Sequence, residues 1–106
     1  MVRGFRFQVV LALLISLGCA VGFAQSAGEA TYKAKCQSCH GAAGTPSPAM
    51  AKMMSIKAVS DPDIKKLTAD QMFDSVKNGK GKMQPFKDKL TDDQIKDSVA
   101  YYRTLK

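Results

Sequence analysis

Apolar residues recur three and four positions apart through most of the chain beyond residue 27, and no stretch alternates apolar and polar positions for long. The first spacing is typical of amphipathic helices, and sustained alternation would indicate strands. We therefore predict an all-α fold without a sheet. It should contain three main helices and one short helix.

The first predicted helix covers residues 28–39. Glu29 lies in its first turn, where a carboxylate is favourable beside the helix dipole. Gly28, Tyr32 and Cys36 follow one another at four-residue steps and therefore share one face. A glycine on such a face weakens the helix, but it is useful where another backbone must come close.

Two further helices are marked by capping boxes, in which Ser or Thr is followed three positions later by Glu or Gln. Thr68 and Gln71 open the first of these helices, which should end at Asn78-Gly79. Thr91 and Gln94 open the last helix of the chain. One face of this last helix is apolar and consists of Ile95, Val99 and Tyr102.

Glycines and prolines divide the remaining segments. Residues 41–48 contain two glycines and two prolines and should form a loop, as should residues 80–86, and residues 61–63 should form a turn. Residues 49–56 can form the short helix. Its methionines are expected to fill the core, as methionine commonly does: Met50, Met53 and Met54.

The beginning of the chain has the pattern of a secretory signal peptide. Arg3 and Arg6 precede an apolar run over residues 9–15, and Gly22 and Ala24 lie at positions −3 and −1 of a cut before Gln25. We therefore predict a signal peptide over residues 1–24 and one domain over residues 25–106.

Two alternatives for this segment remain. An uncleaved membrane anchor is less favoured, because residues 9–24 fall short of the roughly 20 apolar residues that span a bilayer. Lipid attachment at Cys19 is also less favoured, because Ser16 stands where that signal usually has an aliphatic residue.

Charge is unevenly distributed over the predicted mature chain. The whole chain carries 16 basic and 9 acidic residues, and loss of Arg3 and Arg6 leaves 14 − 9 = +5. Residues 77–89 hold five lysines and one acid, whereas residues 61–74 hold four acids and two lysines. A basic patch of this kind suits docking to an acidic protein face. Nucleic acid is a poor fit, because the patch has no arginine and only Phe86 to stack on a base.

The chemically informative motif is Cys36-Gln37-Ser38-Cys39-His40, which has the spacing of covalent c-type haem attachment. Residues three positions apart lie on one side of a helical turn, so both sulfur atoms can reach one edge of a porphyrin. His40 then follows as the proximal iron ligand. Its other ring nitrogen is expected to donate to a backbone carbonyl of the loop over residues 45–48.

Other roles for Cys36 and Cys39 fit less well. A structural zinc site needs two further ligands, but His40 is the only histidine and no cysteine follows Cys39. A thioredoxin-like redox pair would lie beside a βαβ unit, which the pattern does not contain. A plain disulfide remains possible in an exported protein.

Met83 is the predicted distal iron ligand. The other methionines of the mature chain lie on helical faces, where packing is their ordinary role, whereas Met83 lies in a loop between Gly81 and Pro85. A loop can direct one side chain at the iron, and a thioether ligand raises the reduction potential. Residues 50–54 hold the alternative ligands.

With these residues, the chain resembles a class I c-type cytochrome, a small monohaem bacterial cytochrome c, over residues 25–106. The resemblance implies the cytochrome c fold, wrapped around a covalently attached haem. In that family a glycine and an aromatic residue of the first helix cross an aromatic residue of the last one. Gly28 and Tyr32 match this spacing, with Tyr101 as the crossing residue.

Two positions depart from the family pattern. In a common family form proline directly follows the methionine ligand, whereas Gln84 intervenes here before Pro85. The proline that supports the axial histidine in the family has no clear match, and Pro46 or Pro48 stands in its place.

The sequence therefore predicts a periplasmic, monomeric carrier of single electrons, with one haem c and its iron, and not an enzyme. Its partners would be redox proteins with acidic docking faces, steered by Lys80, Lys82, Lys87 and Lys89. One alternative is a haem protein with a labile or open sixth site that acts as gas binder, sensor or peroxidase. Another is a domain without haem that is closed by a disulfide and only binds partners.

Overall fold

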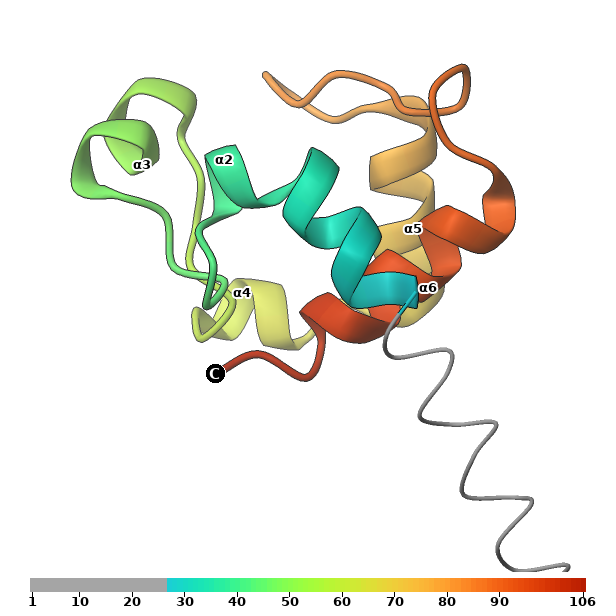
Figure 1. The fold of residues 1–106 in the computed structure, drawn as a ribbon. Helices are drawn as coiled ribbons and strands as arrows, with labels where there is room; N and C mark the ends of the chain where they lie inside the picture. The colour runs from blue at the N-terminus through green and yellow to red at the C-terminus, as the bar shows by residue number, and fades with distance from the viewer. Residues whose placement is uncertain (1–26) are drawn as a thin grey trace, which may run out of the picture.

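A computed structural model of the chain describes residues 27–106, drawn in colour in Figure 1. The predicted signal peptide, its cleavage before Gln25 and Cys19 lie outside these residues. Within them the chain forms no strand, and only an isolated bridge joins Lys80 and Met83. A helix covers residues 27–35, followed by α2 (Gln37–His40), α3 (Pro48–Met54), α4 (Pro62–Lys65), α5 (Ala69–Asn78) and α6 (Asp92–Tyr102). The all-α prediction is confirmed.

The first predicted helix is present but interrupted at Cys36. The Cys36 N–H donates to the Tyr32 carbonyl at 2.9 Å, which continues the helix of residues 27–35. The Cys36 carbonyl then accepts from Cys39 at 3.2 Å and from His40 at 3.0 Å, and a single new turn, α2, begins. Gly41 ends α2 with a φ of 83°, which glycine adopts at little cost.

Both capping boxes are formed. The Thr68 hydroxyl accepts from the Gln71 N–H at 3.1 Å, and the Gln71 side chain accepts from the Thr68 N–H at 2.9 Å. Thr91 and Gln94 repeat this arrangement at 3.2 and 2.9 Å. Each box satisfies two N–H groups that a helix start leaves free, so the sequence predicted both starts from local chemistry alone.

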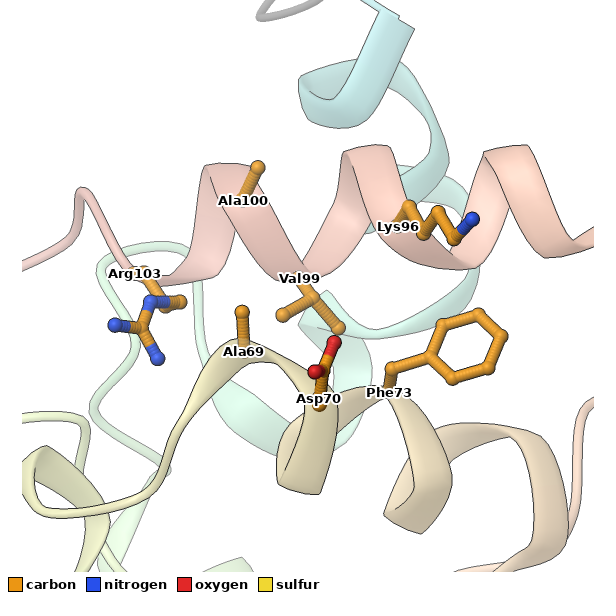
Figure 2. Close-up of a pocket in the computed structure, with 7 residues that line it drawn as sticks. All are labelled: Ala69, Asp70, Phe73, Lys96, Val99, Ala100 and Arg103. Atoms are coloured by element: carbon orange, nitrogen blue, oxygen red, sulfur yellow. The ribbon is translucent and has the colours of Figure 1, made fainter.

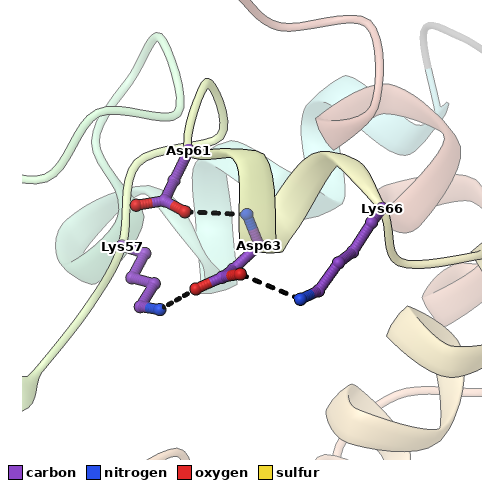
Figure 3. A network of polar contacts seen from close by, with 4 residues as sticks. All are labelled: Lys57, Asp61, Asp63 and Lys66. Carbon is purple, nitrogen blue, oxygen red and sulfur yellow. Dashed lines mark hydrogen bonds and ion pairs between the residues drawn. The ribbon is translucent and has the colours of Figure 1, made fainter.

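One short helix was missed. Residues 61–63 were predicted as a turn, but they open α4, with Pro62 at its first position. The Asp61 side chain accepts from the Asp63 N–H at 2.8 Å and so caps the helix. Figure 3 shows the Asp63 carboxylate between the ammonium groups of Lys57 and Lys66. These cations hold the pKa of Asp63 below its usual value, through hydrogen bonds first and charge second.

The core lies where α5 and α6 pack against each other. Its buried side chains come from α5, α6 and the segment that joins them: Met72, Phe86, Leu90, Ile95 and Val99. The predicted core role is thus confirmed for Met72. It is wrong for Met53 of α3, whose surface is 61% exposed. Met50 and Met54 are half-buried and lie outside this cluster.

The helix of residues 27–35 crosses α6 in backbone contact. A Cβ atom built on Gly28 would lie 2.2 Å from the Asp97 carbonyl oxygen and 3.2 Å from the Tyr101 Cβ. One turn later, the ring of Tyr32 lies 5.4 Å from that of Tyr101 between centroids, and Tyr32 is only 2% exposed. The crossing of Gly28 and Tyr32 with Tyr101 is therefore confirmed.

This contact makes Gly28 hard to replace. We expect Gly28→Ala to lower the free energy of unfolding by about 2 kcal/mol, because the methyl group forces two backbones apart. Urea unfolding of the haem-loaded protein measures the change. Ala30→Ser, at an exposed position of the same helix, serves as the control and should cost about 0.5 kcal/mol or less. Equal stability of the two variants would contradict the close crossing.

Candidate functional site

The thiols of Cys36 and Cys39 lie one helical turn apart, are both half-buried and are not joined to each other. Burial raises the pKa of the Cys36 thiol to about 11, and the neighbouring Cys39 adds to the effect. The folded chain therefore keeps Cys36 protonated near neutral pH, where it is a weak nucleophile.

His40 ends α2 and is half-buried. Burial lowers the pKa of His40, so the imidazole is neutral at pH 7, which is the form that binds metal ions. The ring lies 5.7 Å from that of Tyr102, at 68° to it, so the two pack edge to face. Its Nδ1 is buried and has no hydrogen-bond partner among residues 27–106.

The missing partner corrects one prediction. A carbonyl of the loop over residues 45–48 was expected to accept from this ring, and in the described structure none does. The Thr45 carbonyl instead lies against Gly41, where a Cβ would be only 2.0 Å from its oxygen. Pro46 is buried, and Pro48 occupies the first position of α3. The Thr45 carbonyl of this loop is thus packed against Gly41, and it does not accept a hydrogen bond from His40.

Backbone hydrogen bonds hold the loop that carries Met83 at its tip and at its far end. Lys80 and Met83 exchange backbone hydrogen bonds of 3.1 and 3.0 Å across its tip. At its far end the Phe86 N–H donates to the Val76 carbonyl of α5 at 3.0 Å. Gly79 begins the loop with a φ of 79°, and a Cβ there would lie 2.9 Å from the Met83 carbonyl oxygen. Met83 itself is half-buried and packs against the core.

The two predicted iron ligands border the same core by different routes. Met83 contacts the core cluster directly, and His40 reaches it through Tyr102, which also packs against that cluster. The tip of the Met83 loop also reaches α3, because the Lys82 ammonium donates to the Met53 carbonyl at 2.8 Å. His40 and Met83 are thus linked through the core cluster, and the Met83 loop also contacts α3.

The donor set fits a c-type haem. Two unjoined thiols one turn apart can form the two thioether bonds, and a half-buried, neutral imidazole follows directly. Within residues 27–106, His, Cys, Asp and Glu side chains nowhere gather in threes that could hold a metal ion. The zinc alternative therefore finds no ligand set in that range.

A groove of about 460 Å³ lies elsewhere, between α5 and α6 (Figure 2). Phe73 lies along it, with the Lys96 ammonium 5.9 Å from its ring centre. Asp70 and Arg103 add charges of opposite sign. None of the predicted haem-site residues lines this groove.

Over the described range, each helix is too short or too polar to cross a membrane.

Comparison with known proteins gives the family. A sequence model of the family "Cytochrome C oxidase, cbb3-type, subunit III" matches residues 23–101. The chain belongs to this family of c-type cytochrome domains. No curated protein matches the chain. Among solved structures, it is similar to the KustC0563 c-type cytochrome, with 27% identity and a TM-score of 0.67 over 74% of this chain and 96% of that one. A tyrosine-to-phenylalanine mutant of the same cytochrome gives 26% identity and a TM-score of 0.65, over 74% and 98%.

Family membership confirms the cofactor and the fold class. C-type cytochromes hold haem c and its iron by covalent bonds, and their general role is electron transfer rather than enzymatic catalysis. Domains of this family are typically exported. The individual ligands, Cys36, Cys39, His40 and Met83, stay predictions.

Sequence reasoning missed the roles of two residues at the site. Tyr102 was expected only on the apolar face of the last helix, yet it is the aromatic neighbour of His40. Gly41 has a positive φ and closely packed surroundings. Gly79 ends α5 as predicted and also has a positive φ and close neighbours, whereas Gly81 has a positive φ but no atom within 4 Å of a Cβ built on it. For Gly41, the available signal was its position directly after His40.

The buried tyrosines give a testable pH dependence. Burial raises the pKa of Tyr32 above its usual 10, with Tyr102 adding, and burial also raises the pKa of Tyr102. The folded protein therefore holds these protons more tightly than the unfolded chain. The stability that they contribute is fully present below about pH 10 and is lost as the pH rises further.

We expect the free energy of unfolding to fall between pH 9.5 and 11 in urea titrations, with pH values chosen around the ordinary tyrosine pKa of about 10. Tyr32→Phe removes one of the two ionising groups, so its stability should fall less steeply over this interval. Identical slopes for the variant and the parent would contradict the assignment to Tyr32.

Proposed function

We propose that the chain is an exported monohaem electron carrier, which passes single electrons between redox proteins outside the cytoplasm. Haem c would be held by thioether bonds to Cys36 and Cys39, with His40 and Met83 as axial ligands. The observation that supports this most directly is the c-type family match across a motif whose imidazole is half-buried and neutral. The family description names an oxidase subunit, which agrees with a role in electron transfer.

The chemistry supplied by the bound cofactor is the ferrous–ferric change of its iron. The residues around His40 and Met83 limit the movement of these ligands when the oxidation state changes. His40 is the last residue of α2 and packs against Tyr102. Met83 lies in a loop closed by paired backbone hydrogen bonds. Ligands that move little on electron transfer require little rearrangement of their surroundings, which favours a carrier over a binder of exogenous ligands.

The role of Met83 can be tested by Met83→Ala. We expect this variant to bind carbon monoxide in the ferrous state, to lose the low-spin ferric spectrum and to have a lower reduction potential, because a thioether ligand stabilises ferrous iron. Met50→Ala and Met53→Ala, in α3, are matched controls and should keep the parental spectrum.

Two other outcomes would change the proposal. Unchanged spectra in Met83→Ala, with loss of the spectrum in an α3 variant, would move the distal ligand to that helix. Ready binding of carbon monoxide by the parent protein would replace the carrier with a gas binder, sensor or peroxidase whose sixth site is open or labile.

The basic patch of residues 77–89 supports docking to an acidic partner, although some of its lysines already have partners within the chain. Lys77 pairs with Asp92 at 3.2 Å, Lys82 donates to Met53, and Lys89 donates to Gln84 at 2.8 Å. Lys80 and Lys87 are exposed and form no ion pair within residues 27–106. We propose that these two lysines contribute most to steering.

Lys87→Glu should slow association with an acidic single-electron protein by about tenfold at low ionic strength, and the difference should shrink as salt screens the charges. Stopped-flow electron transfer at several salt concentrations measures the effect. Lys65→Glu, at an exposed position of α4, makes the same change in net charge and is the control. Equal slowing by both variants would point to net charge rather than to a docking face.

A further inference from the structure

Tyr32 connects the helix crossing to the peptide that follows His40. Its hydroxyl donates to the Gly41 carbonyl at 2.6 Å, and the side chain is 2% exposed. Gly41 cannot easily shift to another conformation, because its φ is 83° and the Thr45 carbonyl packs directly against it. The hydrogen bond therefore fixes the backbone on the C-terminal side of His40 to the first helix.

Tyr102 acts on the ring of the same histidine. It meets the imidazole edge to face at a centroid distance of 5.7 Å. Tyr102 is in turn stacked on Tyr32, with centroids 6.1 Å apart and planes 28° from parallel. Two tyrosines from helices at opposite ends of the described chain thus contact each other and hold His40 by its backbone and by its ring.

The ring itself lacks the restraint that a ligating histidine usually has. Such a histidine normally donates its second N–H to a carbonyl or carboxylate, which sets the rotation of the ring. In the described structure, Nδ1 of His40 has no such partner. The contact of Tyr102 with the ring and the hydrogen bond of Tyr32 to the neighbouring peptide are therefore two restraints on His40 that the structure does show.

We propose that Tyr32 and Tyr102 are positioning residues that set the orientation of the His40 imidazole relative to the haem iron, in place of a hydrogen bond from Nδ1. Tyr32 acts through the Gly41 carbonyl, and Tyr102 acts by packing against the ring. The inference rests on the proposed role of His40 as proximal ligand.

The test is proton NMR of the haem-loaded ferric protein. In low-spin ferric haem, the plane of the axial imidazole directs the unpaired electron density, so rotation of the ring redistributes the shifts of the four haem methyl groups. We expect Tyr32→Phe, which keeps the ring and removes only the hydroxyl, to change the spacing or the order of these methyl resonances. Tyr102→Leu, which removes the edge contact, should change them further.

Tyr101→Phe is the matched control, because it removes a hydroxyl from the neighbouring ring of the same cluster. It should leave the methyl pattern as in the parent. A general loosening of the helix crossing would alter the unfolding midpoint of all three variants, whereas a positioning effect alters the methyl pattern of the Tyr32 and Tyr102 variants only.

Two results would overturn the inference, and they differ in what they imply. A parental methyl pattern in both Tyr32→Phe and Tyr102→Leu, with His40 ring signals still strongly shifted by the iron, would show that the tyrosines do not orient the ligand. An absence of iron-shifted His40 ring signals in the parent protein would instead show that His40 is not the ligand, and the proposed ligation would fail with it.

Discussion

The backbone contact between Gly28 and the Asp97 carbonyl is the constraint on which the rest of the described structure depends. It brings two helices close enough for Tyr32 to enter the cluster formed with Tyr101 and Tyr102. A side chain at residue 28 would separate the helices, since packed interiors leave no room to absorb an added methyl group. The same contact therefore sets the distance between the first helix and the residues that hold His40.

The last helix, α6, serves both sides of the site. Ile95 and Val99 bury their side chains against α5, and through Phe86 this core also holds the end of the Met83 loop. Tyr102, one turn beyond Val99, reaches His40. A single apolar face thus links the supports of both proposed ligands, so a disturbance of the α5–α6 core would be felt at both of them.

The number of lysines in the basic patch overstates how many of them are free to meet a partner. Ion pairs and hydrogen bonds to carbonyl or amide groups engage several cations of the basic patch, including Lys77, Lys82 and Lys89. Exposed pairs of this kind add little stability, but they engage the ammonium groups within the chain. In the proposed docking face, the position of each cation therefore counts for more than the total charge.

The sequence by itself determined the features that depend on neighbouring residues. The capping boxes at Thr68 and Thr91 and the Cys36–His40 motif are local, because their partners are at most four residues apart. The tertiary structure alone decided that Tyr102 meets His40, that Nδ1 of His40 lacks an acceptor, and that Met53 is exposed. These features depend on how segments distant in sequence approach one another, which no local pattern of residues encodes.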